Sequence, residues 1–237
     1  MNHTNVIIVS APSGSGKSTL VRLLLEQVPD LVFSISFTTR EPREGEHDGQ
    51  DYCFITPDEF RQRLERNEFL EHAVVFGTHY YGTSRRFLDQ ARASGSDLLL
   101  DIDVQGAAQV KKVVPDAISV FILPPSRQEL EQRLRYRRLD PDHVIERRLQ
   151  QAATEISGYG SYDFVLVNDN LERASECLNS IVLAERWKRR HGNGDVQEPQ
   201  VRHWMELEES RRTARVRAEI EPILKTFHLT EQGANKL

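Results

Sequence analysis

The sequence has few cysteines and no long apolar run, and each shortage excludes a class of protein. Only two of the 237 residues are cysteines, Cys53 and Cys177, and neither belongs to a C-x-x-C pair. We therefore expect two reduced thiols and no disulfide framework. No apolar stretch approaches the roughly 20 residues of a membrane-spanning helix, and the first residues lack the pattern of a signal peptide. We expect a cytoplasmic protein that does not bind a membrane.

The chain also lacks an excess of positive charge. It has 31 Lys and Arg against 36 Asp and Glu, a net charge of −5, which argues against a nucleic-acid-binding protein. The eight histidines show no paired metal-ligand spacing. Any phosphate site must therefore come from a local cluster of donors.

A glycine-rich loop follows the first apolar run and is the strongest functional signal. The segment Ala11-Pro12-Ser13-Gly14-Ser15-Gly16-Lys17-Ser18 comes directly after Val6–Val9 and before a helical pattern. Glycine accepts positive φ at little cost, so backbone N–H groups can point inward around a phosphate. Lys17 then supplies a charge for the β- and γ-phosphates, and the Ser18 hydroxyl supplies a ligand for Mg²⁺. The loop has Ala11 where the pattern G-x-x-x-x-G-K-[ST] has glycine.

Short apolar runs alternate with helical patterns along the first 190 residues. The runs predict four buried strands, at Asn5–Ser10, Leu98–Asp103, Ile118–Leu123 and Phe164–Asn168. The helical patterns lie at Ser18–Glu26, Gly106–Val113, Ser126–Arg138, Asp142–Ser157 and Leu171–Arg189. With the phosphate loop after the first strand, this alternation predicts an α/β fold built on a doubly wound parallel sheet.

Two insertions interrupt the alternation. The first, about residues 33 to 95, is too long for a crossover helix and predicts a small mixed α/β subdomain. Its expected pieces are strands at Phe33–Phe37, Tyr52–Thr56 and Val74–Phe76 and a helix at Pro57–Arg66. The second insertion, about residues 124 to 158, is helical and rich in arginine.

The first insertion carries residues suited to a phosphorylated acceptor. Arg40 and Arg43 flank a turn fixed by proline and offer forked donors for a second phosphate, to which Tyr52 can add a hydroxyl. A carboxylate such as Glu71 can accept from the adjacent N1–H and N2–H₂ donors of guanine, an arrangement that adenine does not offer. A tyrosine can stack on the base, and Ser36 or Thr83 can donate to its O6.

The second predicted strand ends in carboxylates, and the helical insertion is rich in guanidinium groups. Asp101 or Asp103, at the carboxyl end of a strand, can hold Mg²⁺ through its water shell. We expect three or four arginines of the helical insertion to face the transferring γ-phosphoryl group and the rest to be solvated beside glutamates. The candidates are Arg127, Arg133, Arg135, Arg137, Arg138, Arg147 and Arg148.

Together these motifs resemble a guanylate kinase over about residues 5–190. The matching segments are Ser10 to Ser18, Ser36 to Arg43, Phe69-Leu70-Glu71, Tyr80-Tyr81-Gly82-Thr83, Leu100 to Gly106 and Val167-Asn168-Asp169. The resemblance implies transfer of the ATP γ-phosphate to GMP and dGMP, giving GDP and ADP, with Mg²⁺. It also implies a core of residues 1–32, 97–125 and 159–190, a GMP-binding subdomain of residues 33–96 and a helical lid of residues 126–158.

The resemblance further implies roles for individual residues. The ATP-binding residues are Ala11, Pro12, Ser13, Gly14, Ser15, Gly16, Lys17, Ser18 and Thr19, with Asn168 near the adenine. Those that act on the transferring phosphoryl group are Lys17, Ser18, Arg133, Arg137 and Arg148. Those that hold the GMP phosphate are Arg40, Arg43, Tyr52 and Tyr81, and those that orient the guanosine are Ser36, Glu71, Thr83 and Asp103. Ser18 and Asp101 are the expected Mg²⁺ ligands, the latter through water.

The chain departs from the family pattern at three places. Arg133-Leu134-Arg135-Tyr136-Arg137-Arg138 stands where many relatives have R-L-x-G-R-G, which leaves Arg137 and Arg138 as alternatives for one role. Asn168-Asp169-Asn170 replaces N-D-D and predicts a weaker contact on the adenine side. The stretch Gly77-Thr78-His79-Tyr80-Tyr81 is one residue longer than G-N-Y-Y.

Two other classes of function remain as alternatives. Guanylate-kinase-like domains also serve as peptide-binding scaffolds, but these typically have degraded phosphate loops, whereas Gly16-Lys17-Ser18 is intact here. The other alternative is a kinase of a different small phosphorylated acceptor, against which Glu71, Tyr81 and Thr83 favour guanine.

The chain after Arg190 lies outside the resemblance. A linker-like stretch at His191–Asp195 precedes a charged helical stretch around Val201–Phe227, in which Pro222 should kink or break the helix. We expect this extension to pack back on the core or to pair with another subunit in a homo-oligomer, in preference to disorder. We also expect it to be unnecessary for catalysis.

Overall fold

The structure, a computed structural model, describes residues 4–43, 45–75, 79–136, 141–192, 194 and 196–229. They form two compact units. The first comprises the described residues of Met1–Ile8 and Asp30–Ile118, and the second those of Val9–Pro29 and Ser119–Leu237. The phosphate loop therefore belongs to the second unit, and the predicted guanosine residues belong to the first.

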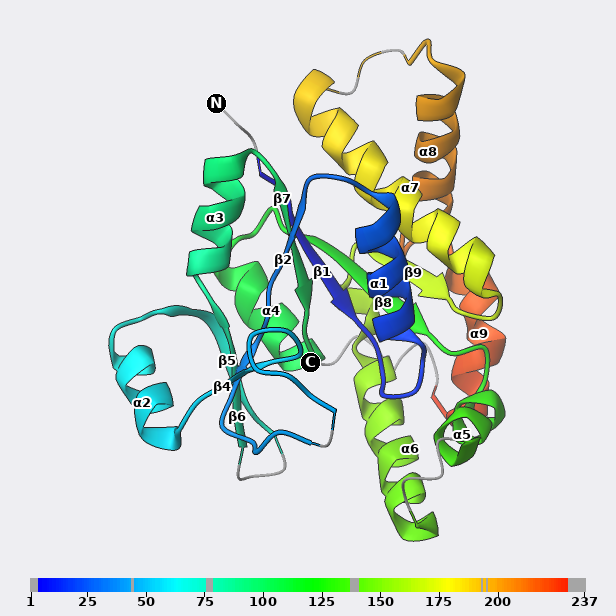
Figure 1. Ribbon diagram of the computed structural model, residues 1–237. Helices are drawn as coiled ribbons and strands as arrows, with labels where there is room; N and C mark the ends of the chain where they lie inside the picture. Colours follow the sequence, from blue (N-terminus) through cyan, green and yellow to red (C-terminus); the bar gives the residue numbers. More distant parts are fainter. Residues whose placement is uncertain are drawn as a thin grey trace. The chain divides into compact units, whose positions relative to one another are not determined.

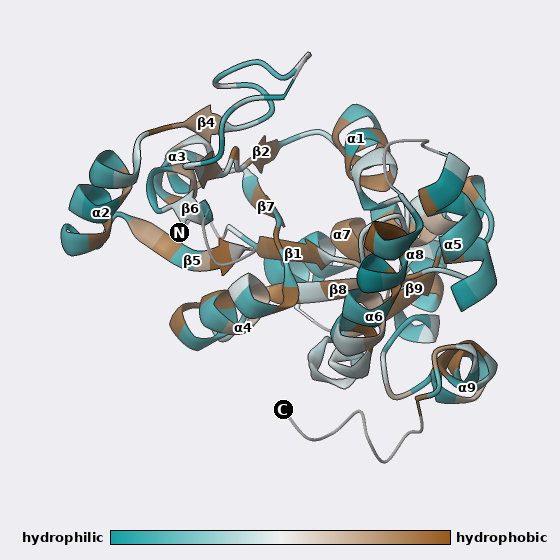
Figure 2. Ribbon diagram, turned by 90° about the horizontal axis from the view of Figure 1, so that it is seen from below, coloured by the Kyte–Doolittle hydropathy of each residue, from teal (hydrophilic) through white to brown (hydrophobic). Residues whose placement is uncertain are grey.

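A five-stranded sheet has the strand order β2-β7-β1-β8-β9 (Figure 1). Its strands are β1 (Val6–Ser10), β2 (Leu31–Phe33), β7 (Asp97–Asp101), β8 (Ile118–Leu123) and β9 (Phe164–Val167). β2 pairs with β7 in parallel within the first unit, and β8 pairs with β9 in parallel within the second. The four strands expected from apolar runs are confirmed. Figure 2 shows β1 and β9 as mainly hydrophobic, as strands buried on both faces should be.

The expected helices are also present. They are α1 (Lys17–Gln27), α4 (Val104–Val113), α5 (Arg127–Tyr136), α6 (Asp142–Ser157) and α7 (Leu171–His191). Each buries an apolar stripe, such as Ile145, Leu149 and Ile156 on α6. By contrast α5 is mainly hydrophilic (Figure 2) and buries only Leu130 and Leu134. These two leucines pack against the phosphate loop.

The first insertion forms a four-stranded sheet with the order β4-β3-β6-β5. Its strands are β3 (Phe37–Thr38), β4 (Cys53–Phe54), β5 (Phe69–Val75) and β6 (His79–Ser84), and its helices are α2 (Pro57–Glu65) and α3 (Arg86–Ser94). Phe37, Phe60 and Phe69 form the core between α2 and this sheet. Thr56 begins α2 with a capping box, since its hydroxyl accepts from Glu59 N while the Glu59 carboxylate accepts from Thr56 N.

The expected single strand at Phe33–Phe37 is wrong. The chain follows β7 as far as Ser34, whose N–H donates to Leu99 O (3.0 Å), and then leaves the first sheet. It joins the second sheet at Ser36, whose carbonyl accepts from Cys53 N (2.9 Å). One apolar stretch is thus divided between two sheets. β6 and α3 are further elements that the sequence pattern did not predict, and Phe76 lies outside the described residues.

The extension after Arg190 belongs to the second unit and packs there on α7 and beside β9, as the first of the two expected alternatives predicts. It contains α8 (Pro199–Ser210), which packs on α7, and α9 (Arg217–Thr226). Between these helices, Arg211 O accepts from Val165 N (2.9 Å) and Thr213 N donates to Asp163 O (3.0 Å). This segment therefore satisfies backbone groups along β9, at one edge of the sheet. The helix α9 runs through Pro222, so the expected break at that residue does not occur.

A buried carboxylate joins α7 to α8. Glu208 is 1% exposed, and its two oxygens pair with Lys188 Nζ at 2.5 Å and Arg212 Nη2 at 2.6 Å. Burial raises the pKa of Glu208, while the two cations favour its charged form. Arg212 also lies over the Phe164 ring, 5.0 Å from its centroid. The network thus connects the extension to both α7 and β9.

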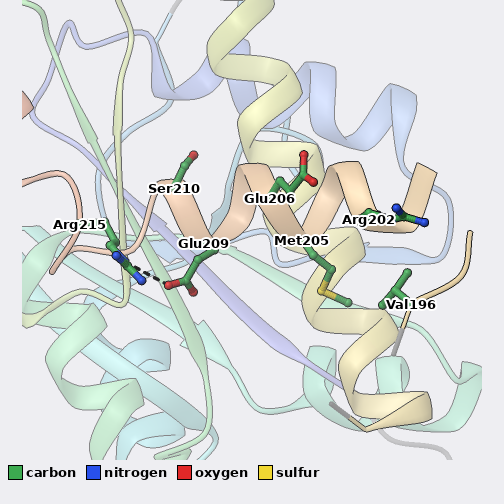
Figure 3. Close-up of a pocket in the computed structure, with 7 residues that line it drawn as sticks. All are labelled: Val196, Arg202, Met205, Glu206, Glu209, Ser210 and Arg215. Carbon is green, nitrogen blue, oxygen red and sulfur yellow. Dashed lines mark hydrogen bonds and ion pairs between the residues drawn. The ribbon is translucent and has the colours of Figure 1, made fainter. Parts of the chain in front are cut away.

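A shallow hollow of about 580 Å³ lies on another face of α8 (Figure 3). It is lined by Val196, Arg202, Met205, Glu206, Glu209, Ser210 and Arg215. No residue in this lining is a predicted nucleotide ligand. Among the described residues, no helix combines the length and the apolar character needed to cross a membrane.

The Glu208 network leads to a prediction about stability. Glu208→Gln removes the buried counterion of Lys188 and Arg212. Glu185, which is partly exposed, remains as the carboxylate that both cations contact. The substitution should therefore lower the free energy of unfolding by about 1–3 kcal/mol. Denaturant titration measures this change. Glu209→Gln is the matched control, because Glu209 pairs with Arg212 and Arg215 from a half-exposed position and should change stability by less than about 1 kcal/mol. Equal losses in the two variants would contradict the role given to Glu208.

Candidate active site

The loop between β1 and α1 has the backbone conformation that phosphate binding requires. Gly14 and Gly16 have φ values of +93° and +89°, in the left-handed region that favours glycine. Ser15 N donates to Pro12 O at 3.1 Å, which closes the turn. The helix α1 begins at Lys17, and its first N–H groups lack partners within the helix. The loop therefore ends at the positive pole of a helix, where anions bind.

Two neighbours fix this loop. A Cβ added at Gly14 would lie 3.0 Å from both Leu130 Cδ1 and Leu134 Cδ2 of α5. A Cβ added at Gly16 would lie 2.3 Å from Asn168 Nδ2. The buried Asn168 amide donates to Ser15 O at 2.7 Å. The glycines thus serve packing as well as conformation.

Arg133 is connected to the same cluster. Its Nη2 donates to Asn168 O at 3.1 Å, and its Nε pairs with Glu129 Oε1 at 3.1 Å. Arg148 is half-buried on α6. The structure therefore brings Arg133 to the segment that holds the phosphate loop. Arg137 and its alternative Arg138 lie outside the described residues.

In the first unit, Glu71 and Thr83 form a buried pair across two strands. Glu71 on β5 is opposite Thr83 on β6, next to a register shift between Phe69 and Glu71. Thr83 Oγ1 donates to Glu71 Oε1 at 2.6 Å, and Glu71 is only 5% exposed. Burial raises the pKa of Glu71 to about 7, with a smaller contribution from the charge of Asp103 and an opposing one from the Thr83 hydrogen bond.

The start of α4 surrounds this carboxylate. A Cβ added at Gly106 would lie 2.8 Å from Glu71 Oε2, so only glycine permits the present approach. Asp103 precedes α4, and its Oδ1 caps the helix by accepting from Gly106 N at 2.8 Å. Gln109, one turn later, donates to His72 O (2.7 Å) and accepts from His72 N (3.2 Å). The side chain of Gln109 thereby ties α4 to the residue after Glu71.

Arg40 is the centre of a second group in this unit. Its Nε donates to Tyr81 Oη at 3.2 Å, and its Cζ lies 5.3 Å from the centroid of the Tyr52 ring. Its Nη2 donates to both oxygens of Glu46, at 2.9 and 2.8 Å. Hydrogen bonds to Glu46 and Tyr81 raise the pKa of Arg40 against the opposing effect of burial. Burial raises the pKa of Tyr52, so both groups keep their usual charge at neutral pH.

The remaining predicted residues have less specific settings. Arg43 is exposed, and its N–H donates to Glu46 Oε2 at 2.8 Å. Ser36 is half-buried just before β3. Asp101 ends β7, and its negative charge contributes to the raised pKa of Tyr52. Asp101 therefore interacts electrostatically with Tyr52, whose ring is in contact with Arg40.

The described residues contain no cluster of three or more His, Cys, Asp or Glu that could hold a metal ion. A Mg²⁺ ion needs no such cluster, because it is commonly bound by one or two protein oxygens together with phosphates and water. In the second unit, the exposed Ser18 hydroxyl on the first turn of α1 is a suitable donor. Asp101, in the first unit, carries a carboxylate that suits a water-mediated contact. Each of these oxygen donors, taken within its own unit, is of the kind that Mg²⁺ accepts directly or through water.

Three residues that shape these groups were not predicted from the sequence: Glu46, Gly106 and Gln109. Glu46 had a local signal, because it follows Arg40 by six positions and Arg43 by three. Gly106 and Gln109 act on the strand that carries Glu71, far away in the sequence, so no local signal indicates them.

Comparisons with known proteins agree on one family. Residues 3–185 match the family model described as guanylate kinase. The guanylate kinase of Koribacter versatilis is 57% identical over 188 residues, which are 78% of this chain and 80% of that protein. The guanylate kinase of Escherichia coli K12 is 50% identical over 188 residues, 78% of this chain and 90% of that protein. The crystal structure of guanylate kinase from Anaplasma phagocytophilum aligns with a TM-score of 0.64 and 32% identity, covering 87% of this chain and 95% of that one.

The raised pKa of Glu71 predicts a pH dependence of stability. Its pKa of about 7 in the folded chain exceeds its ordinary value of 4.5, so the folded state binds more protons between these pH values. Stability therefore falls as the pH rises from about 4.5 to about 7, by up to about 3 kcal/mol from this residue. Glu71→Gln cannot ionise, so it should gain stability relative to the wild type over this range in denaturant titrations.

The control for this measurement is Glu65→Gln, which replaces an exposed carboxylate on α2. Its stability should run parallel to that of the wild type at each pH. A parallel profile for Glu71→Gln as well would contradict the assignment of a raised pKa to Glu71.

Proposed function

Because the chain belongs to the guanylate kinase family, we propose that it transfers the γ-phosphate of ATP to GMP, and to dGMP, and releases ADP and the nucleoside diphosphate. The buried Glu71–Thr83 pair carries the assignment of the acceptor. A carboxylate accepts from N1–H and N2–H₂ of guanine, whereas adenine has an acceptor at N1 and no donor at C2. Burial strengthens this discrimination, because a base without donors at these positions would leave the buried Glu71 carboxylate without hydrogen bonds, at a cost in binding free energy.

The second unit binds ATP in this proposal. The N–H groups of the loop from Ala11 to Thr19 and the positive end of α1 hold the phosphates. Lys17, the first residue of α1, adds its charge at the β- and γ-phosphates. Asn168 supports this binding through Ser15, whose carbonyl accepts its amide hydrogen bond. Arg133 stabilises the negative charge that develops on the transferring phosphoryl oxygens.

The first unit binds GMP. Arg40, Arg43, Tyr52 and Tyr81 hold its phosphate, and Ser36, Glu71, Thr83 and Asp103 orient the guanosine. In the structure, Glu46 occupies the guanidinium of Arg40 through two charge-assisted hydrogen bonds. This carboxylate holds the Arg40 guanidinium beside Tyr81 and Tyr52. The guanidinium is therefore already oriented when a phosphate binds, and less conformational freedom is lost on binding.

The reaction needs no general base. The second pKa of a phosphate monoester is about 6, so the attacking oxygen of GMP is already ionised at neutral pH. The work of the protein is to align the two phosphates, neutralise their charge and exclude water. Arg137 and Arg148 belong to this catalytic set in the proposal.

Bound Mg²⁺ would neutralise and orient the ATP phosphates. Ser18 would supply one ligand through its hydroxyl, and Asp101 would contact the water shell of the ion. We assign residues 33–96 to a GMP-binding subdomain, residues 126–158 to a lid and the remainder of 1–190 to the core. The two cysteines are both free, which supports a cytoplasmic setting.

The proposal is tested by two variants, each of which should impair the use of a different substrate. Lys17→Ala should reduce ADP formation in the presence of ATP, Mg²⁺ and GMP at least about a hundredfold, because it removes a charge at the reacting phosphates. Glu71→Gln should raise the KM for GMP about tenfold to a hundredfold, because an amide oxygen replaces a charged acceptor. A coupled assay and the melting temperature are measured together.

Each variant serves as the control of the other. Glu71→Gln should leave ATP affinity unchanged, and Lys17→Ala should still bind GMP. Wild-type turnover with AMP equal to that with GMP would exclude the guanine assignment. Near-normal turnover of Lys17→Ala would exclude the assignment of the phosphate loop.

A further inference from the structure

The extension beyond the family match touches the helix that packs on the phosphate loop. The family match ends at residue 185, whereas α9 spans Arg217–Thr226. Within the second unit, α9 packs against α5 (Figure 1). Its apolar side, with Ile220, Ile223 and Leu224, is buried. The extension is therefore a built part of this unit and not a loosely attached tail.

One hydroxyl group joins the ends of these two helices. Thr226 Oγ1 accepts from Arg127 N at 2.9 Å and donates to Ile223 O at 2.7 Å. Arg127 N is the first N–H of α5, and Ile223 O belongs to the last turn of α9, so both groups lie where helices leave backbone groups unpaired. The negative end of α9 thus meets the positive end of α5, an arrangement that both helix dipoles favour.

Arg127 is also the junction between α5 and α6. Its Nη2 pairs with both oxygens of Glu146 at 3.1 and 3.2 Å. Ser126 supplies a second cap to α5, since its Oγ accepts from Glu129 N at 3.1 Å. The first turn of α5 is thus held by its own cap, by α6 and by the extension.

The next turns of α5 make the contact with the phosphate loop. Leu130 and Leu134 are the side chains that a Cβ at Gly14 would meet, and Arg133 donates to Asn168 O. These residues begin one turn after Arg127, so the position of the first turn determines theirs. A change at Thr226 can therefore reach the loop without any contact between Thr226 and the nucleotide.

We propose that Thr226 is a positioning residue, which fixes the first turn of α5 and so holds Arg133 and the leucine contacts in the arrangement that binds and uses ATP. This inference rests on the proposed function, because it gives α5 a role in phosphoryl transfer. It also replaces the expectation that the extension is unnecessary for catalysis.

The test is a kinetic comparison of Thr226→Val with Thr226→Ser in the full chain. Valine keeps the shape of threonine but cannot accept from Arg127 N, whereas serine can. We expect Thr226→Val to lower kcat/KM for MgATP about fivefold, because Arg133 and the leucine contacts would be less well positioned for the reacting phosphates. The KM for GMP should stay within about twofold of the wild type, because the predicted GMP ligands belong to the first unit. Thr226→Ser should restore most of the loss.

Lys225→Gln is the matched control. Lys225 is the neighbouring exposed residue of α9, where it pairs with Glu221, and its replacement should leave both parameters unchanged. A merely structural role of Thr226 would lower the melting temperature and raise the KM values for MgATP and for GMP in parallel. That result would overturn the proposal, as would wild-type kinetics of Thr226→Val.

A second variant removes the same hydrogen bond from the other helix. Arg127→Pro eliminates the N–H donor at the first position of α5, where proline is well tolerated. Relative to Arg127→Ala, Arg127→Pro should lower kcat/KM for MgATP by the same factor as Thr226→Val does relative to the wild type. Adding Thr226→Val to Arg127→Pro should lower it no further. The comparison of Arg127→Pro with Arg127→Ala tests the proposal even if Thr226→Val does not fold. Equal kcat/KM values for MgATP in these two variants would overturn it. A wild type without GMP-dependent ADP formation would instead contradict the proposed function itself.

Discussion

The conformation of the phosphate loop depends on two glycines with positive φ and on the neighbours that press against them. At Gly14 the neighbours are two leucines of α5, and at Gly16 the neighbour is the amide of Asn168. A side chain at Gly14 would press on the ends of the two leucines, one at Gly16 would meet the buried Asn168 amide, and either residue would have to adopt a strained positive φ. The open turn, the end of β9 and the helix α5 therefore depend on one another, and the phosphate site is a property of their joint packing.

The guanosine side depends on a different constraint, the burial of a carboxylate. Glu71 is held by Thr83 across the sheet and approached closely by Gly106 at the start of α4. Its pKa of about 7 shows that the folded chain holds this charge at a cost in stability. A ligand that donates two hydrogen bonds would offset that cost, and this is the physical basis of the guanine specificity that we propose.

The sequence predicted the elements with strong local patterns and missed those set by distant partners. β8 and α6 have the expected bounds, Ile118–Leu123 and Asp142–Ser157, because an unbroken apolar run and a sustained helical period leave few alternatives. The strand expected at Phe33–Phe37 failed because pairing with β7 ends after Ser34. The site residues Glu71 and Thr83 were predicted, whereas Gln109 binds a residue 37 positions away and Thr226 one 99 positions away. Such pairs leave no local pattern.

In the proposed function, the backbone at the loop glycines, and not only the charge of Lys17, determines ATP binding. Calorimetric titration of Gly16→Ala with MgATP and, separately, with GMP tests it most directly. Alanine would have to adopt a φ of +89° with its Cβ 2.3 Å from Asn168 Nδ2, so MgATP affinity should fall at least about tenfold. GMP affinity should remain that of the wild type. Unchanged MgATP affinity, or an equal loss for both nucleotides, would contradict the account.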